Sequence, residues 1–132
     1  MDSRELRIGN LLDRGDYICK VKMIEEEGLM LEPINYKEER FVERYIKPIP
    51  LTEEWLIKLG FEKIINELWD VISYHIPLND RLRLEIFNDF SFEVFDFTEG
   101  NSLLLDFEKF RGVHHLQNFV YFLTNKELEY NG

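Results

Sequence analysis

The segment Ile46–Lys63 encodes a short helix together with its start and its stop, and it divides the chain into two parts. Two prolines, Pro48 and Pro50, hold the preceding backbone extended. Thr52 can accept hydrogen bonds from the first turn, where two glutamates place negative charge at the positive end of the helix. Gly60 readily adopts the left-handed conformation that ends helices. We therefore predict a helix that begins at Thr52 and ends directly before Gly60.

Short apolar runs separated by turn-forming residues fill the first 50 residues. The runs are Leu6–Leu12, Tyr17–Ile24, Leu29–Ile34 and Phe41–Ile46. Four strands joined by tight turns predict a small curled antiparallel sheet of the SH3-like kind.

Alternation of apolar and polar residues resumes after the predicted helix. It is clearest in Arg81–Phe87, where the apolar side chains would face one way and the charged ones the other. The remaining predicted strands are Phe61–Ile65, Leu68–His75, Phe90–Phe97 and Ser102–Phe107. This pattern predicts an antiparallel meander with one solvated face.

The last predicted element is an amphipathic helix that begins at Val113. Its apolar residues recur at the spacing that places them on one helical face, and Asn125 is suited to end the helix. They are Val113, Leu116, Phe119, Val120 and Leu123. We expect this helix to lie across the meander and close its core.

The predicted fold class is α+β. Residues 1–50 would form an N-terminal β-rich lobe, and residues 51–132 an α+β lobe of a helix, antiparallel strands and a C-terminal helix. The alternative is one compact domain, because 132 residues suit either arrangement.

The net charge of −10 bears on which partners the protein has. Residues 1–50 carry 11 acidic and 9 basic residues, a net charge of −2, whereas residues 51–132 carry 15 acidic and 7 basic residues, a net charge of −8. Such a surface repels phosphate backbones and anionic membranes. We therefore expect no membrane partner. A nucleic acid is disfavoured for residues 51–132 and only permitted for residues 1–50.

Cysteine usage and hydropathy favour a cytoplasmic location. Cys19 is the only cysteine, lies in an alternating run, and is expected to be a small buried residue. The sequence contains no signal-peptide pattern and no apolar run near the ~20 residues needed to cross a bilayer.

One face of the predicted C-terminal helix is polar but almost uncharged, which is unusual for a solvated helix. The four residues stand at i, i+3, i+4 and i+7 and are His114, Gln117, Asn118 and Tyr121. All four can donate and accept hydrogen bonds. This combination suits packing or capping of the neighbouring sheet, and it also suits recognition, so the four residues are our candidate interaction surface.

The sequence predicts no catalytic, cofactor-binding or metal-binding residues. His114 and His115 are adjacent, so on a helix they point about 100° apart and are poorly placed for one ion. The seven glycines form no phosphate-binding loop, and Cys19 has no neighbour that would activate it. An enzyme would need a pocket that joins His75 or His114 to a buried carboxylate.

Aromatic side chains are expected to be core residues, although stacking on nucleic-acid bases is the alternative. The residues considered are Trp55, Trp69, Tyr74, Phe95 and Phe97. Few basic residues lie between them, which favours the core.

Three blocks of the sequence carry a resemblance to known proteins. They are ELRIGN at Glu5–Asn10, IKPIPLTEEWLIKLGFEK at Ile46–Lys63 and VHHLQNFVYFLTNKEL at Val113–Leu128. Together they resemble a family of small uncharacterised proteins from bacterial phages, prophages and mobile elements. The family shows Gln where this chain has His115, and Gly where it has Asn125. The resemblance implies a compact intracellular protein of mobile-element origin. It implies no activity and no catalytic residues.

The function that we predict is a non-enzymatic protein-interaction module that acts on a host or phage protein. One alternative is an acidic DNA mimic that inhibits a nucleic-acid enzyme. Another is a nucleic-acid-binding small barrel that uses Arg7, Lys20, Lys22, Arg40 and Arg44. We expect a protein partner and no cofactor, and we leave a homo-oligomer open.

Overall fold

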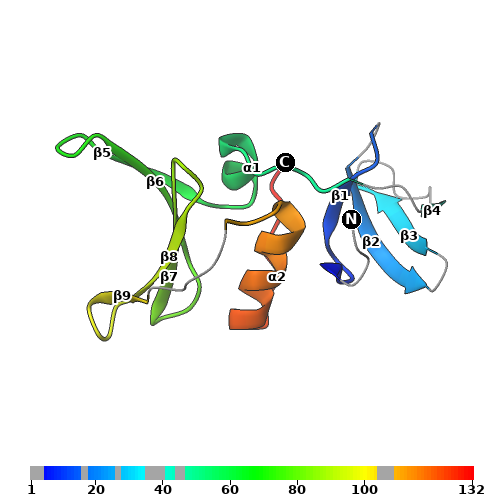
Figure 1. Ribbon diagram of the computed structural model, residues 1–132. Coiled ribbons are helices and arrows are strands. Elements are labelled where there is room, and N and C mark those ends of the chain that lie inside the picture. The colour runs from blue at the N-terminus through cyan, green and yellow to red at the C-terminus, as the bar shows by residue number, and fades with distance from the viewer. Residues whose placement is uncertain (1–4, 16–17, 26–27, 35–40, 44–46, 104–108) are drawn as a thin grey trace. The chain divides into compact units, whose positions relative to one another are not determined.

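The computed structural model describes all of the chain except residues 1–4, 16–17, 26–27, 35–40, 44–46 and 104–108 (Figure 1). Contacts divide the chain into two compact units. The first unit comprises Met1–Pro50 and Arg111–Phe119, and the second comprises Leu51–Phe110 and Val120–Gly132. The division at Pro50 coincides with the predicted lobe boundary, but residues 111–119 join the first unit rather than the second.

The first unit contains a four-stranded antiparallel sheet with its strands in sequence order. The strands are β1 (Leu11–Asp13), β2 (Ile18–Glu25), β3 (Gly28–Pro33) and β4 (Phe41–Glu43). Beyond β4, Lys47 pairs with Asp13 at the outer edge of β1 through two backbone hydrogen bonds of 3.1 Å. The chain thus returns to the first strand, but in the described residues this is an isolated bridge, so the curled sheet is not a closed barrel.

One face of this sheet carries a small hydrophobic core. Its buried members are Leu6, Leu12, Cys19, Val21, Leu29 and Leu31. The expectation that Cys19 is a small buried core residue is confirmed.

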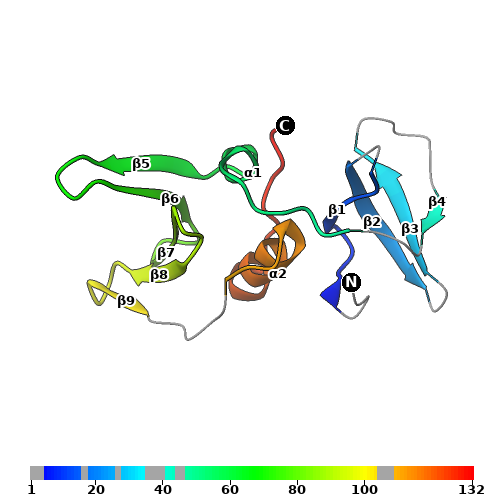
Figure 2. The ribbon, with the colours of Figure 1, turned by 45° about the horizontal axis from the view of Figure 1, so that its top comes forward.

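The second unit contains a five-stranded antiparallel meander, also in sequence order. The strands are β5 (Glu62–Asn66), β6 (Val71–Pro77), β7 (Leu82–Phe87), β8 (Phe92–Asp96) and β9 (Asn101–Leu103). The sheet curves between its two edge strands, β5 and β9 (Figure 2). Cross-strand neighbours such as Leu84 and Val94 are both buried, which defines the inner face.

Helix α1 (Glu53–Lys58) has the start and stop that the sequence predicts. The Thr52 hydroxyl accepts a hydrogen bond of 3.2 Å from the Trp55 N–H. Gly60 has φ +94°, and beyond it the Phe61 N–H donates to the Leu56 carbonyl at 3.0 Å.

Helix α2 (Val113–Thr124) is also confirmed, and Asn125 ends it with φ +57°. Val113, Leu116 and Val120 are buried as expected. The first seven residues of the helix belong to the first unit and the last five to the second. None of the helices in the described residues is both long and apolar enough to cross a membrane.

The α+β class is therefore confirmed, with two antiparallel sheets, a short helix and a C-terminal helix. The predicted strand Leu6–Leu12 is wrong for most of its length, because the chain turns at Gly9, where φ is +99°. The Asn10 side chain supports that turn by accepting a hydrogen bond of 2.7 Å from the Arg7 N–H.

The turn between β5 and β6 also differs from the prediction. It spans residues 67–70 instead of lying at Asn66 and Glu67. The Asn66 side-chain oxygen accepts hydrogen bonds from the N–H groups of Leu68 and Trp69, at 3.1 and 3.3 Å, and Asp70 adopts φ +51°. Leu68 and Trp69, predicted as strand residues, are therefore turn residues.

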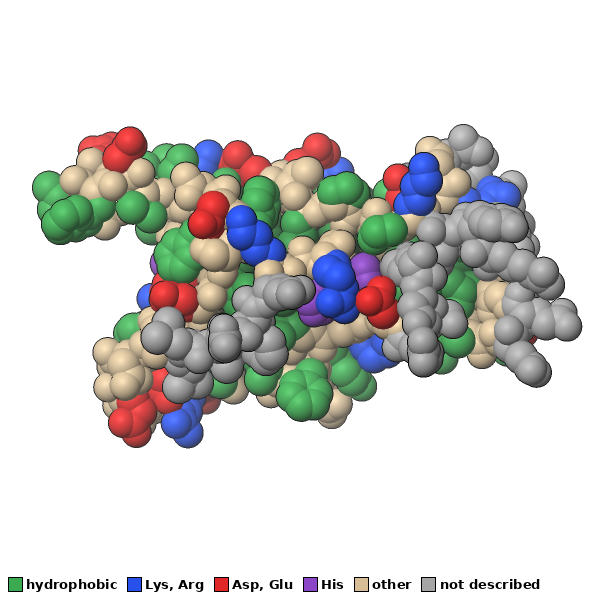
Figure 3. Space-filling model, in the orientation of Figure 1, with side chains coloured by type: hydrophobic (Ala, Val, Ile, Leu, Met, Phe, Trp, Pro, Cys, Tyr) green, Lys and Arg blue, Asp and Glu red, His purple; other side chains and the backbone are tan. Residues whose placement is uncertain are grey.

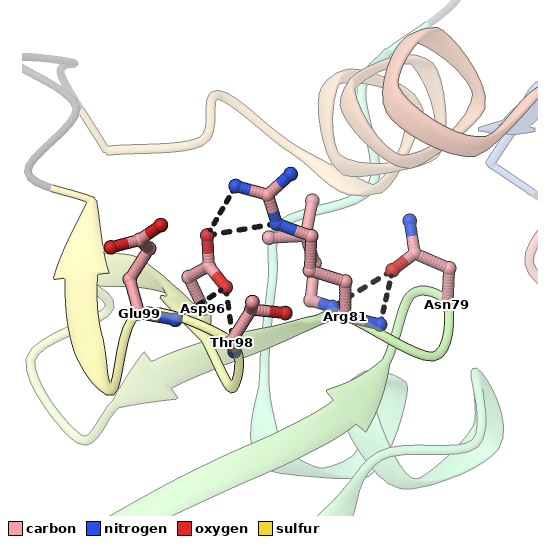
Figure 4. Close-up of polar contacts among 6 residues, drawn as sticks. Asn79, Arg81, Asp96, Thr98 and Glu99 are labelled. Carbon is pink, nitrogen blue, oxygen red and sulfur yellow. Dashed lines mark hydrogen bonds and ion pairs between the residues drawn. The ribbon is translucent and has the colours of Figure 1, made fainter.

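An ion pair between exposed Arg81 and buried Asp96 fastens the start of β7 to the end of β8 (Figure 4). Arg81 Nε and a terminal nitrogen donate to one Asp96 oxygen at 2.9 and 2.7 Å. The other Asp96 oxygen accepts from the N–H groups of Thr98 and Glu99 at 2.8 and 3.2 Å. The Arg81 guanidinium holds the pKa of Asp96 below its usual value, so this carboxylate is ionised and both of its oxygens are occupied.

Gly112 should be the glycine least tolerant of substitution. Its φ is +155°, and a Cβ atom there would lie 2.9 Å from the Ile49 carbonyl oxygen, which is backbone and cannot move aside cheaply. We expect Gly112→Ala to lower the free energy of unfolding by about 3 kcal/mol in urea denaturation.

Gly100→Ala is the matched control, because Gly100 also has positive φ but nothing lies within 4 Å of its added Cβ. It should cost only about 1 kcal/mol. Equal losses for the two variants would show that close approach at Gly112 is unimportant.

Candidate functional site

The four polar residues predicted on the C-terminal helix are arranged unequally. His114 and Gln117 are buried, and Asn118 and Tyr121 are half-buried. The first three lie in the part of α2 that belongs to the first unit, and Tyr121 lies in the part that belongs to the second.

The Gln117 side chain completes the hydrogen bonding of the backbone that leads into β1. Its oxygen accepts from the Leu11 N–H at 2.8 Å and from the Asn10 side-chain amide at 3.4 Å. Its nitrogen donates to the Gly9 carbonyl at 3.3 Å. Since buried polar groups need partners, the Gln117 amide has a structural role as the partner of the Leu11 N–H and the Gly9 carbonyl.

The neighbouring Asn118 binds the same segment from one position further along the helix. Its oxygen accepts from the Asn10 amide at 2.7 Å and from Arg7 Nε at 3.2 Å. Its nitrogen donates to the Glu5 carbonyl at 2.8 Å. The two amides together hold Glu5–Leu11 against the helix.

These contacts bring together residues from all three blocks that carry the family resemblance. Besides the Glu5–Asn10 contacts with α2, the Val113 N–H donates to the Ile49 carbonyl at 2.9 Å. Residues of the three blocks thus meet within the first unit through hydrogen bonds, which gives Asn10, Gln117 and Asn118 a structural role. The interaction role of the His114–Tyr121 face stays a prediction.

His114 is a buried imidazole without a hydrogen bond in the described residues. It is 1% exposed, and neither ring nitrogen has a partner. Its Nε2 lies 3.8 Å from a Glu5 carboxylate oxygen, which is longer than a hydrogen bond, and the other Glu5 oxygen lies 3.1 Å from Arg111. Burial lowers the pKa of His114, and the Glu5 charge opposes that effect only in part.

His75 lies in a second polar cluster, on the outer face of the meander. Its Nε2 is 2.9 Å from the Ser73 hydroxyl and 3.9 Å from a Glu85 oxygen, and Glu85 is also hydrogen-bonded by Arg83. Burial lowers the pKa of His75. The Arg83 guanidinium lies over the Phe95 ring, 5.0 Å from its centroid.

The second unit also has a groove that this second cluster does not line. The groove is about 300 Å³ and is lined by residues that follow α1 and by residues of β6, α2 and the C-terminal segment, including Leu59, Ile76 and Leu128. His75, Glu85 and Ser73 do not line it. The described residues also contain no group of three or more His, Cys, Asp or Glu placed to hold a metal ion.

Four acidic side chains of the second unit are paired with cations, which bears on the DNA-mimic alternative. The pairs are Lys63–Glu53, Lys58–Glu54, Arg81–Asp96 and Arg83–Glu85. Pairing reduces the free acidic charge that mimicry of a phosphate backbone needs.

The basic-patch alternative also lacks support. Arg7 donates to Asn118 and to the Ile8 carbonyl, and Lys22 lies 3.9 Å from Glu32. Arg40 and Arg44 lie outside the described residues.

The feature that sequence reasoning missed is a cluster of exposed apolar side chains at the outer end of the β5–β6 hairpin, which we name the hairpin tip. It consists of Ile65, Leu68, Trp69 and Val71, which are 60%, 84%, 73% and 38% exposed. The core assignment of aromatic residues is confirmed for Tyr74, but it is wrong for Trp69 and for Phe97, which is also exposed. Trp55 and Phe95 are half-buried.

The hairpin tip projects because β5 and β6 extend past β7 (Figures 1 and 2). The last β6–β7 pair is Ser73 with Phe87, whereas β5 and β6 continue to pair as far as Asn66 and Val71. The end of the hairpin is therefore two-stranded, and Figure 3 shows hydrophobic side chains gathered there beside acidic ones. The signal in the sequence was Asn66, whose side chain can fold the next two residues into a turn.

Removing the Gln117 amide should destabilise the protein. We expect Gln117→Leu, which keeps the volume but leaves the Leu11 N–H unpaired, to lower the free energy of unfolding in urea by about 2 kcal/mol. Phe122→Leu on the same helix is the control, because Phe122 is 87% exposed, and it should change stability by less than about 0.5 kcal/mol. Similar stabilities for the two variants would show that the amide contributes little.

His114 should make the protein less stable in acid. The ordinary histidine pKa is about 6.5, and the folded-state pKa of His114 is lower, so protonation favours the unfolded chain. The contribution of neutral His114 is present above pH ~6.5 and is lost as the pH falls through the folded-state pKa. We therefore expect the stability of His114→Gln, measured by urea denaturation, to fall less than that of the wild type between pH 7 and pH 5.

His115→Gln is the control for this measurement. Burial also lowers the pKa of His115, but this residue is only half-buried and its Nδ1 already accepts from the Arg111 N–H at 3.0 Å. The two variants are compared by the slope of stability against pH, so a general loss of stability does not matter. A slope for His114→Gln equal to that of the wild type would exclude His114 as the group that titrates.

Comparisons with known proteins assign no family to this chain: no family model matches it, and neither a curated protein nor a solved structure matches it significantly.

Proposed function

We propose that the protein is a non-enzymatic interaction module whose docking surface is the hairpin tip. The observation that carries this proposal is the exposure of Leu68 and Trp69 at the end of a two-stranded projection. Clustered apolar groups in water are unfavourable unless something covers them, and tryptophan is enriched among the residues that dominate protein interfaces.

The conformation of the hairpin tip supports a binding role. The Asn66 side chain fixes the N–H groups of Leu68 and Trp69, and Asp70 closes the turn in a left-handed conformation. A surface that is already ordered loses less conformational entropy on binding. The hairpin tip is thus preorganised for a partner.

The partner that we propose is a host or phage protein, as the resemblance to proteins of mobile elements implies, and we place the encounter in the cytoplasm. The other polar clusters support this assignment indirectly. The amides of Gln117 and Asn118 are engaged within the first unit, and the Glu85 carboxylate is paired with Arg83. The hydrogen bonds of these side chains are largely made within the protein, whereas the apolar side chains of the hairpin tip are exposed to a partner.

A photo-crosslinking residue at position 69 should trap the partner. We expect p-benzoylphenylalanine in place of Trp69, irradiated in cells of the native host, to give one dominant covalent adduct. Adducts are detected by gel shift and identified by mass spectrometry.

The same substitution at Phe122 is the matched control, because Phe122 is an equally exposed aromatic residue on α2. It should not give the dominant adduct seen at position 69. The adduct should also weaken when Leu68→Ser is added. Absence of a specific adduct at position 69, in cells that contain folded protein, would refute the proposal.

A further inference from the structure

We infer that the partner contributes an extended, positively charged segment that pairs with strand β5 as an additional strand and covers the hairpin tip. This inference rests on the proposed function and specifies how the partner binds. Strand addition is a common mode of recognition in which backbone hydrogen bonds provide affinity and side chains provide specificity.

The first argument is the position of β5. It is an edge strand of the meander, and in the part of the chain that is described it pairs only with β6. Four of its five side chains are exposed. An edge strand presents unpaired N–H and carbonyl groups, which another extended chain can bind.

The second argument is that the described residues place no third strand beside the outer end of the hairpin. β7 stops pairing at Ser73, so among these residues the pairs Ile65–Ile72 and Asn66–Val71 have no neighbour on the β6 side. Isolated two-stranded hairpins are marginally stable in water. A strand added to β5 would widen this part of the sheet and bury Ile65.

The third argument is charge. Glu62, Glu67 and Asp70 flank the apolar residues, and the one lysine of the hairpin, Lys63, is paired with Glu53 at 2.6 Å. The chain as a whole carries a net charge of −10, which opposes self-association and attracts basic partners. A basic segment is therefore favoured over a second copy of this chain.

The test uses the full-length protein and a defined probe, a nine-residue peptide in which lysine and valine alternate. The matched control is the same peptide with glutamate in place of lysine. Backbone amide hydrogen exchange is measured across the chain at low ionic strength. Fluorescence is measured in a Trp55→Phe background, in which Trp69 is the only tryptophan. We expect the lysine peptide to slow exchange of the outward-facing β5 amides at least about tenfold.

Proline variants identify the backbone contribution. Neighbouring residues of an edge strand direct their N–H groups alternately toward the paired strand and away from it. One of the two variants Ile64→Pro and Ile65→Pro therefore removes an N–H that points away from β6 and leaves the β5–β6 pairing intact. The variant that keeps the wild-type melting temperature should lose the protection. Raising the salt concentration should also weaken it.

Each other result overturns the inference. A fluorescence change without protection of β5 would exclude strand addition, while docking at the hairpin tip would stand. Equal protection by the glutamate peptide would exclude the charge argument. Protection that appears with protein concentration alone would identify a second copy as the added strand. No effect of the lysine peptide on either measurement would refute the inference, whereas the proposed function is tested separately by the adduct at position 69.

Discussion

The first unit depends on the pairing of the Gln117 and Asn118 side-chain amides with the backbone that leads into its edge strand, β1. Because the chain turns at Gly9, β1 is only three residues long, and the N–H of its first residue finds its partner in Gln117. Asn10 sits between the two helix amides and is itself fully buried. Leaving a buried polar group unpaired lowers the free energy of unfolding by more than an ordinary hydrogen bond adds to it. Few other residues are therefore tolerated at these positions.

The charged residues of the second unit follow the same rule. Asp96 is enclosed by Arg81 and two backbone N–H groups, and Glu85 is held by Arg83. The Arg81 guanidinium lowers the pKa of Asp96, so this carboxylate stays ionised at neutral pH. Arg81, Asp96, Arg83 and Glu85 thus serve to fix strands and turns of the meander.

Local signals in the sequence predicted both helices, because caps and stops act over a few residues, as Thr52, Gly60 and Asn125 show. The polar face of α2 was also identified, but its partners were not, since Gln117 and Leu11 are 106 residues apart in sequence. The hairpin tip was missed for a different reason. Its side chains are hydrophobic, and composition favours the core for such residues unless the Asn66 turn is recognised.

The hairpin tip belongs to neither hydrophobic core, since none of its four side chains is buried. Substitutions at Leu68 or Trp69 therefore leave the packing of the meander intact and cost little folding free energy. On the proposed function, the residues that would contact a partner are therefore distinct from those that stabilise the fold. A lineage under pressure to change its target can diversify this turn freely, while the amides that fasten the N-terminal segment remain fixed.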